Sequence, residues 1–323
     1  MDELLRGLRA AAEPTRLRLL ALCAHGELSV GELTQILGQS QPRVSRHLKL
    51  LCDAGLLDRF REGTHAFFRL AQSGAMADLA RVFVDSIPES DESQALDFER
   101  LDGIKKARAR AAAAYFRQNA ARWDEIRSLY VDEREVERVL LTLFSDADLE
   151  DLLDIGTGSG RILALLAPLA ARPVGIDQSR EMLAIARANL DAEKLHHCVV
   201  RQGDMYKLPW HAAAFDAVTV HQVLHFADEP AEVIAEAARV LRPGGRLVIV
   251  DFAPHDLEAL RSEHAHRRLG FADEDIAKWC EDAGLRPQPA ICLPGDPLTV
   301  SVWSAIRSRA ADEVVATSSR VAP

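Results

Sequence analysis

The apolar positions follow two different rhythms along the chain. Residues 3–54 repeat apolar side chains with helical spacing, as in the run from Leu17 to Leu22 that follows Pro14, and this spacing predicts four short helices. Residues 56–70 instead alternate apolar and polar side chains on both sides of Arg61-Glu62-Gly63-Thr64. Such alternation around a polar, glycine-containing turn predicts a β-hairpin.

Short polar signals mark where the helices begin and end. Ser29 lies three residues before Glu32, which is the spacing of a capping box, and Ser40 is placed to cap the next helix. Gly26 and Gly38 mark helix ends. Helices followed by a hairpin, in this order, predict a winged helix-turn-helix, which is mainly α-helical.

The middle of the chain changes composition. Residues 86–94 are polar and contain Pro and Ser, which predicts a linker. Residues 95–127 are rich in Ala, Arg and Glu, with one Gly and no Pro, and they predict one or two long helices. Another helix is expected over residues 133–144.

Strand and helix patterns alternate from residue 151 onward. Five apolar segments, at 151–156, 172–177, 198–204, 215–220 and 246–252, are separated by helical stretches. This alternation predicts an α/β fold with a parallel sheet. Residues 291–294 and 298–306 suggest a closing hairpin, and the polar end of the chain suggests a tail.

Charge is unevenly distributed over the 323 residues, whose formal net charge is −10. Residues 1–75 hold ten Lys and Arg against eight Asp and Glu, a net of +2, and the remainder holds 29 against 41, a net of −12. Contacts with DNA would therefore have to come from the N-terminal part.

Cysteine usage and apolar run length indicate the compartment. The five cysteines, at positions 23, 52, 198, 280 and 292, form no C-x-x-C pair, so we interpret them as free thiols. The longest apolar runs, such as residues 163–171, are too short to span a bilayer, and the N-terminus lacks the apolar core of a signal peptide. We expect a cytoplasmic protein without a membrane segment.

The helix that begins near residue 40 has the character of a DNA-reading helix. Its polar side chains suit base edges and phosphates, while Val44, Leu48 and Leu51 form a buried stripe. The candidate DNA contacts are Ser40, Gln41, Arg43, Ser45, Arg46, His47, Lys49 and, at the hairpin tip, Arg61. The alternative is a solvated helix face in a dimerisation module.

This helix, with the segments before and after it, resembles the ArsR/SmtB winged-helix repressors over about residues 4–72. The resemblance implies a homodimer on double-stranded operator DNA, and we expect residues 3–11 and 73–86 to form its contact. Metal-sensing members carry paired cysteines before the turn, but residues 27–33 contain no thiol. We therefore predict no metal site.

A glycine-rich turn follows the first strand of the second half. Asp154, Gly156, Gly158 and Gly160 let the backbone approach a ligand at a helix N-terminus, and Arg161 excludes the dinucleotide pattern G-x-G-x-x-G. Two acids follow at later strand ends. Asp177 is placed to accept ribose hydroxyls, and Asp204 is placed to accept from an adenine amino group.

The order of these features resembles the class I methyltransferases that use S-adenosylmethionine (SAM), over about residues 115–305. The resemblance implies a Rossmann-like, seven-stranded sheet, SAM or S-adenosylhomocysteine (SAH) as the ligand, and a lid helix over residues 115–130 that includes Trp123. The implied cofactor contacts are Asp154, Gly156, Thr157, Gly158, Gly160, Asp177, Gln178, Met182, Asp204, Met205, His221 and Gln222.

Histidines gather after the fourth and fifth strands, where loops of this fold open over the ligand. They could shape a pocket for a methyl acceptor, bind a metal, or be ordinary packed residues. The acceptor-pocket candidates are His221, His225, Glu263, His264 and His266, and no catalytic residue is assigned.

The expected division of the chain has four parts: a winged-helix domain at 1–86, linker and lid helices at 87–130, a methyltransferase-like domain at 131–310 and a flexible tail at 311–323.

Three hypotheses about function follow from these parts. The first is a transcriptional regulator, a repressor of methionine-cycle genes, that senses SAM or SAH. The second is a small-molecule methyltransferase with an autoregulatory DNA-binding domain. A DNA methyltransferase is disfavoured, because His221-Gln222-Val223-Leu224 replaces the Asp/Asn-Pro-Pro-aromatic loop of such enzymes.

Overall fold

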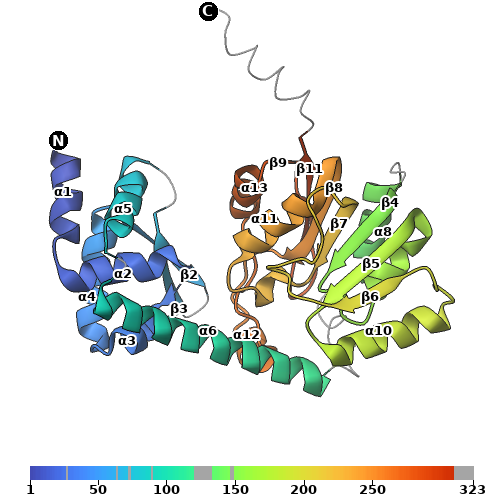
Figure 1. Ribbon diagram of the computed structural model, residues 1–323, viewed down its shortest axis with the longest axis horizontal. Helices are drawn as coiled ribbons and strands as arrows, with labels where there is room; N and C mark the ends of the chain where they lie inside the picture. The colour runs from blue at the N-terminus through green and yellow to red at the C-terminus, as the bar shows by residue number, and fades with distance from the viewer. Residues whose placement is uncertain are drawn as a thin grey trace, which may run out of the picture. The chain divides into compact units, whose positions relative to one another are not determined.

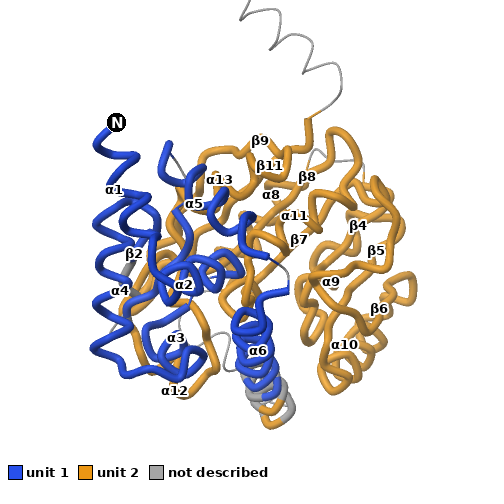
Figure 2. The backbone as a smooth tube through the Cα atoms, turned by 60° about the vertical axis from the view of Figure 1, so that its left-hand side comes forward, with its two compact units in different colours: residues 1–111 blue, residues 112–323 orange. Residues whose placement is uncertain are grey.

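The computed structural model describes residues 1–26, 28–62, 65–71, 74–88, 90–119, 133–145 and 149–308. The chain forms two compact units, Met1–Ala111 and Ala112–Pro323 (Figure 2). Each has its own core. Among the described residues, no helix combines the length and the apolar character that crossing a bilayer requires.

The first unit contains the four predicted N-terminal helices and the predicted hairpin. The helices are α1 (Asp2–Ala11), α2 (Pro14–Ala24), α3 (Val30–Leu37) and α4 (Gln41–Asp53). The strands β2 (Leu57–Glu62) and β3 (His65–Leu70) pair antiparallel. A short strand, β1 (Leu28–Ser29), pairs with the other side of β3 and completes a three-stranded sheet. This is the expected winged helix-turn-helix.

The two predicted helix caps behave differently. Ser29 and Glu32 form the capping box, since each backbone N–H is accepted by the other residue's side chain. Ser40 does precede α4, but its hydroxyl accepts no capping bond. Pro42 has no N–H to offer, and the N–H of Arg43 donates to the carbonyl of Ser40, 3.0 Å away. The hydroxyl of Ser40 therefore stays on the exposed side of the helix start.

Two more helices complete this part of the chain, α5 (Ala75–Asp85) and the long α6 (Glu92–Asn119). The first half of α6 packs into the N-terminal core instead of forming a free linker. Arg18 binds both carboxylate oxygens of Asp97, and Arg100 donates to the carbonyl of Ile36, 2.7 Å away. Leu101 is buried in the same core. The rest of the expected lid, including Trp123, lies outside the described residues.

The second unit is built on a twisted sheet (Figure 1). Its strands are β4 (Leu149–Ile155), β5 (Ala170–Asp177), β6 (Val199–Gln202), β7 (Phe215–His221), β8 (Leu241–Phe252), β9 (Leu285–Pro287), β10 (Ile291–Leu293) and β11 (Val300–Arg307). The order is β10-β11-β8-β7-β4-β5-β6, with β9 also paired to β11. The five strands β4 to β8 are mutually parallel, and β11 is antiparallel to β8.

The outer edge of this sheet explains how the expected seven strands become eight. Pro287 of β9 pairs with Ala305, and Ile291 of β10 pairs with Val302, so both short strands run along the same side of β11. They act as two pieces of one interrupted edge strand. The sheet therefore has the seven positions that the resemblance implied, with the closing hairpin of β10 and β11 where the pattern placed it.

Alternate residues of the central strands face opposite cores, because side chains alternate along a strand. Leu153 and Val218 join one core with the helices α11 (Pro230–Val240) and α13 (Asp273–Asp282). Leu152 and Ala217 join another core with α8 (Glu133–Phe144) and α9 (Arg161–Leu166). The remaining helices are α10 (Arg180–Ala192), beside α9, and the short α12 (Ala259–Glu263). The result is three layers, helix–sheet–helix (Figure 1).

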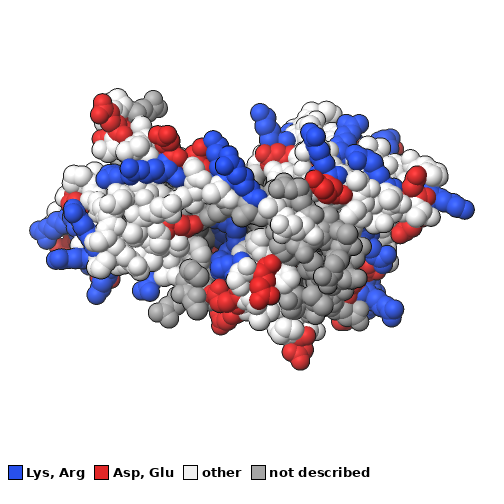
Figure 3. All heavy atoms as spheres, turned by 90° about the horizontal axis from the view of Figure 1, so that it is seen from below, with Lys and Arg blue, Asp and Glu red and all other residues white. Residues whose placement is uncertain are grey.

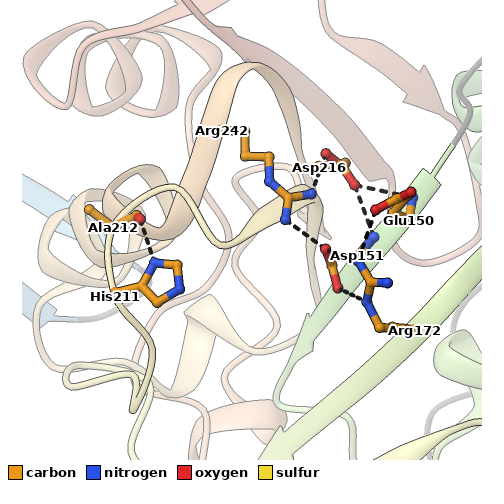
Figure 4. Close-up of polar contacts among 7 residues, drawn as sticks. All are labelled: Glu150, Asp151, Arg172, His211, Ala212, Asp216 and Arg242. Atoms are coloured by element: carbon orange, nitrogen blue, oxygen red, sulfur yellow. Dashed lines mark hydrogen bonds and ion pairs between the residues drawn. The ribbon is translucent and has the colours of Figure 1, made fainter.

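The amino ends of the central strands are joined by ion pairs (Figure 4). Arg242 bridges Asp151 and Asp216 at 2.6 and 2.7 Å, and Arg172 binds Asp151 and Glu150. Hydrogen bonding to Arg172, more than to Arg242, holds the pKa of Asp151 below its ordinary value. Since this network occupies the amino ends, the opposite, carboxyl ends of the strands are where loops can build a ligand site.

Candidate functional site

The glycine-rich turn after β4 is held in a conformation that few residues adopt. Gly156, Gly158 and Gly160 have φ values of +68°, +53° and +81°. A Cβ at Gly156 would lie 2.3 Å from Cγ2 of Val223, so a side chain there has no room. The N–H of Thr157 donates to the carbonyl of Ile176 at 2.9 Å, which fastens the turn to β5. The close packing of Val223 and the positive φ values therefore require glycine in this turn.

Asp177, at the end of β5, connects the glycine turn to the next helix. One carboxylate oxygen accepts from the N–H of Gly158 at 2.9 Å, and the other accepts from the N–H of Ser179 at 2.8 Å. Burial raises the pKa of Asp177, and the backbone N–H donors oppose that rise. A carboxylate has about four acceptor positions, so capacity for two hydroxyl donors is left.

The other predicted cofactor residues fall into a buried group and a more exposed group. Asp154 is buried and accepts from the hydroxyl of Thr219 at 2.6 Å, within the sheet. Met182 is fully buried in α10, and its backbone N–H donates to Ser179. Gln178 and Asp204 are exposed, and Met205 is half-buried. Gln178 follows β5, and Asp204 and Met205 follow β6, where Met205 packs against the core of the second unit.

The loop after β7 contains a strained residue. Gln222 has φ of +52°, which is uncommon for a residue with a side chain, and its N–H donates to the carbonyl of Val250 at 2.7 Å. Its side-chain Nε2 and the Oγ1 of Thr157 are buried and have no hydrogen-bond partner among the described residues. His221, the preceding residue, is also buried. Unpaired polar atoms of this kind fit a site that a polar ligand completes.

One of the predicted histidines, His225, forms a buried pair with an aspartate that the sequence analysis did not predict. Nδ1 of His225 lies 2.8 Å from Oδ1 of Asp251, and the N–H of His225 donates to the other oxygen at 3.2 Å. Asp251 is fully buried and also accepts from the N–H of Phe252. Asp251 was not predicted as a site residue. The available signal was its position at the end of β8, at the same edge as His225.

Other rings pack around His225. The ring of His266 stacks on it with centroids 3.9 Å apart and planes 18° apart, and Phe226 and Phe252 lie beside it. Burial lowers the pKa of His255 and holds that of His266 well below its ordinary range.

The remaining acceptor-pocket candidates lie nearby along the chain. His264 is half-buried and Glu263 is exposed. Among the described residues, no group of three or more His, Cys, Asp or Glu is arranged to hold a metal ion.

The predicted DNA contacts lie on one side of α4. The exposed ones are Ser40, Gln41, Arg43, Ser45, Arg46 and Lys49. His47 differs, since its ring turns toward Glu13 with Nδ1 3.7 Å from Oε2, and burial lowers its pKa. The side chain of Arg61, the predicted contact at the hairpin tip, lies outside the described part of the structure. On the face drawn in Figure 3, basic and acidic side chains are interspersed.

Comparisons with known protein families agree with the division of the chain into two units. Residues 13–59 match the family described as bacterial regulatory protein, arsR family, and residues 153–249 match the methyltransferase domain family. The chain thus joins an ArsR-type winged helix-turn-helix to a methyltransferase domain with a Rossmann-like fold. Both parts of the resemblance found in the sequence are confirmed, and the expected S-adenosyl ligand agrees with the second match.

Curated relatives cover parts of the chain. An uncharacterised 37.1 kDa protein in transposon TN4556 of Streptomyces fradiae is 33% identical over 200 residues, 56% of this chain and 54% of its own length. A demethylmenaquinone methyltransferase of Thermus thermophilus is 41% identical over 106 residues, 32% of this chain and 47% of its own length. The chain therefore spans about half the length of these relatives.

A solved structure shows the same fold for the second unit. Magnesium protoporphyrin IX methyltransferase from Synechocystis, determined with bound SAH, has a TM-score of 0.50 and 19% identity, covering 62% of this chain and all of that chain. At this identity the likeness concerns the fold alone.

Proposed function

We propose that the protein is a DNA-binding transcriptional regulator whose methyltransferase domain binds SAM or SAH. The observation that carries the proposal is the pairing of an exposed basic recognition helix with an intact glycine turn and strand-end acids. Arg43, Arg46 and Lys49 are exposed on α4, where they are free to neutralise phosphates. No thiol lies at residues 27–33, so the signal that controls DNA binding is expected from the second unit.

The residues at the carboxyl ends of β4, β5 and β7 fit a nucleoside that carries an amino acid. Asp177 keeps acceptor capacity for ribose hydroxyls, and the unpaired Nε2 of Gln222 and Oγ1 of Thr157 offer partners to the polar amino-acid end. The structure of the Synechocystis methyltransferase of the same fold was determined with bound SAH, which supports this assignment. SAM supplies an activated methyl group when bound.

A second copy of the chain is the partner that the first unit suits. Leu4, Leu5 and Leu8 of α1 and Val82 of α5 are exposed, with exposed fractions between 39% and 56%. The two helices contact each other, so these side chains belong to neighbouring elements. Burying such side chains against a symmetric copy would form a homodimer suited to palindromic operator DNA.

Titrating the full chain into a labelled DNA fragment from upstream of its coding region tests the regulatory role. The titration is run without ligand, with SAM and with SAH. We expect one ligand to change the DNA affinity by about fivefold or more, since coupling between sites usually exceeds that. Equal DNA affinities in all three titrations would contradict the proposal.

A second function, methyl transfer to a small molecule, is favoured by the buried His225–Asp251 pair. A regulator that only senses its ligand has no need of an imidazole with a carboxylate partner at the same edge of the sheet. Incubating the chain with methyl-labelled SAM and a cell extract tests this function. Labelled small molecules support it, whereas no transfer to any of them counts against it.

A further inference from the structure

We propose that His225, oriented by Asp251, is the base that accepts the proton of a weakly acidic hydroxyl group on a planar methyl acceptor. This inference rests on the second proposed function, and it names the chemical class of the acceptor. It follows from the orientation of the His225 ring and from the surfaces that surround it.

Hydrogen bonding fixes the protonation state of the two ring nitrogens. Nδ1 of His225 lies 2.8 Å from a carboxylate oxygen of Asp251, which can only accept when ionised, so Nδ1 carries the proton. Asp251 is itself held in place by the N–H groups of His225 and Phe252. Nε2 of His225 therefore carries the lone pair of the ring.

Asp251 also stabilises the charged ring that proton uptake produces. It is fully buried and touches the ring directly, so the attraction between imidazolium and carboxylate is weakly screened. The same pairing of a histidine with a buried carboxylate supports proton transfer in hydrolases of unrelated fold. The other ionisable groups near this cluster are His255, Asp256, Arg261, His264 and His266.

Aromatic side chains pack around His225. Phe226 and Phe252 lie with ring centroids 4.1 and 5.6 Å from His225, and His266 is stacked at 3.9 Å. Faces and edges of planar rings pack well against another planar ring. Phe226 is the half-buried member of this group, so a planar acceptor beside His225 would meet an aromatic side chain.

The chemistry of methyl transfer explains why the acceptor atom is oxygen. A neutral amine attacks with its own lone pair, and a thiol ionises readily, so neither depends on a strong base. A phenolic hydroxyl, with an ordinary pKa of about 10, is mostly protonated near neutral pH and benefits from a base within hydrogen-bond reach. A histidine–carboxylate pair is therefore useful for methylating a phenolic hydroxyl and unnecessary for methylating an amine or a thiol.

The hydroxyl proton moves to Nε2 of His225, and the acceptor oxygen forms a bond to the methyl carbon. The carbon–sulfur bond of the sulfonium breaks, and its electron pair stays on sulfur as a neutral thioether. Release of the imidazolium proton to water restores His225. No oxidant, reductant or metal enters this balance.

Ionisation of 4-nitrophenol in the presence of SAH tests the proposal without turnover. This probe is planar, its hydroxyl is weakly acidic, and only its phenolate absorbs visible light. We expect binding to the full chain to lower the probe's pKa by about one unit or more, because the proton moves to an imidazole held beside a carboxylate. No increase in phenolate at saturating protein would overturn the proposal.

Matched variants make the assignment specific. His225→Gln should abolish the pKa shift of the probe, while the same substitution at the exposed His196 should leave the shift unchanged. Asp251→Asn should move the proton of His225 from Nδ1 to Nε2, which nitrogen-15 NMR of the ring reports directly. A probe shift that persists in His225→Gln would contradict the role of this ring.

Calorimetry of SAH binding separates the two levels of inference. A wild-type chain that binds no SAH would refute the proposed function itself. A wild-type chain that binds SAH but leaves 4-nitrophenol protonated would refute only the base. If His225→Gln binds SAH like the wild type, its effect on the probe cannot come from misfolding, and the role of His225 is then supported.

Discussion

Arg18 of α2 and Asp97 of α6 form a two-pronged ion pair, with Nε to Oδ2 at 2.6 Å and Nη2 to Oδ1 at 2.7 Å. Asp97 is almost completely buried, although it lies in residues 87–130, which were expected to form linker and lid helices outside the winged-helix domain. Hydrogen bonding to Asp97 raises the pKa of Arg18. The pair ties the long helix to the second helix of the N-terminal unit.

Replacing Asp97 with Ala should destabilise the N-terminal unit by about 2–3 kcal/mol, because a largely buried guanidinium loses its counter-charge. Chemical denaturation followed by circular dichroism measures the change. Glu99→Ala, an exposed substitution on the same helix, serves as the control and should change the stability by less than about 0.5 kcal/mol. Equal stabilities of the two variants would show that the ion pair contributes little.

Arg46→Ala should weaken DNA binding and make it less sensitive to salt. If Arg46 neutralises one phosphate, the slope of log K against log salt concentration should fall in magnitude by about 1. Binding titrations at several salt concentrations measure this slope, and SAH affinity should be unaffected. Arg81, an exposed residue on α5, provides the control substitution. An unchanged slope in Arg46→Ala would place this side chain away from the DNA.

Gly156→Ala should abolish SAH binding. The added Cβ would lie 2.3 Å from Val223, in a backbone conformation with φ of +68°, so the turn has to move. Gly103→Ala is the matched control, since a Cβ there meets nothing within 4 Å. That control should bind SAH normally and should be stabilised by roughly 0.5–1 kcal/mol as a helical glycine is removed. Calorimetric titration of both variants gives the comparison.

The free energy of unfolding should decrease as the pH falls below about 6.5. His266 and His255 have folded-state pKa values lowered by burial, whereas their unfolded values are ordinary. In this window the unfolded chain binds more protons, so stability rises with pH and is lost on acidification. Denaturant titrations across the window measure the dependence. His266→Phe keeps a planar ring and should make the curve flatter, and an equally steep curve would contradict this explanation.

Leu8→Glu should prevent the proposed homodimer from forming, so that the chain is a monomer. Leu8 is 42% exposed on α1, and a carboxylate on each copy would oppose burial of this surface. Light scattering after size exclusion measures the mass. The control, Leu141→Glu, changes a leucine on α8 that is 37% exposed and lies in the other unit. Identical masses for both variants would move the dimer contact elsewhere.

Local patterns in the sequence predicted the features that depend on neighbouring residues. The capping box of Ser29 and Glu32, the glycine turn and the position of Asp177 at a strand end all follow from short-range spacing. The pairing of His225 with Asp251 could not be predicted in the same way, because it depends on two strands that fold side by side.

Long-range packing could not be predicted at other positions either. Met182 is a predicted cofactor contact, and the structure buries its side chain fully. His47 is a predicted DNA contact, and its ring lies 3.7 Å from a carboxylate oxygen of Glu13. In both cases the residue type allowed two environments, and only the assembled fold selects between them.

The long helix α6 carries a consequence for how such proteins are assembled from parts in evolution. Its early turns supply Asp97, Arg100 and Leu101 to the N-terminal core, and Arg100 bonds the carbonyl of Ile36 just before the recognition helix. A genetic exchange that replaced the ligand domain at residue 87 would therefore remove part of the DNA reader's own interior. A viable breakpoint has to fall further along the same helix, after residue 111.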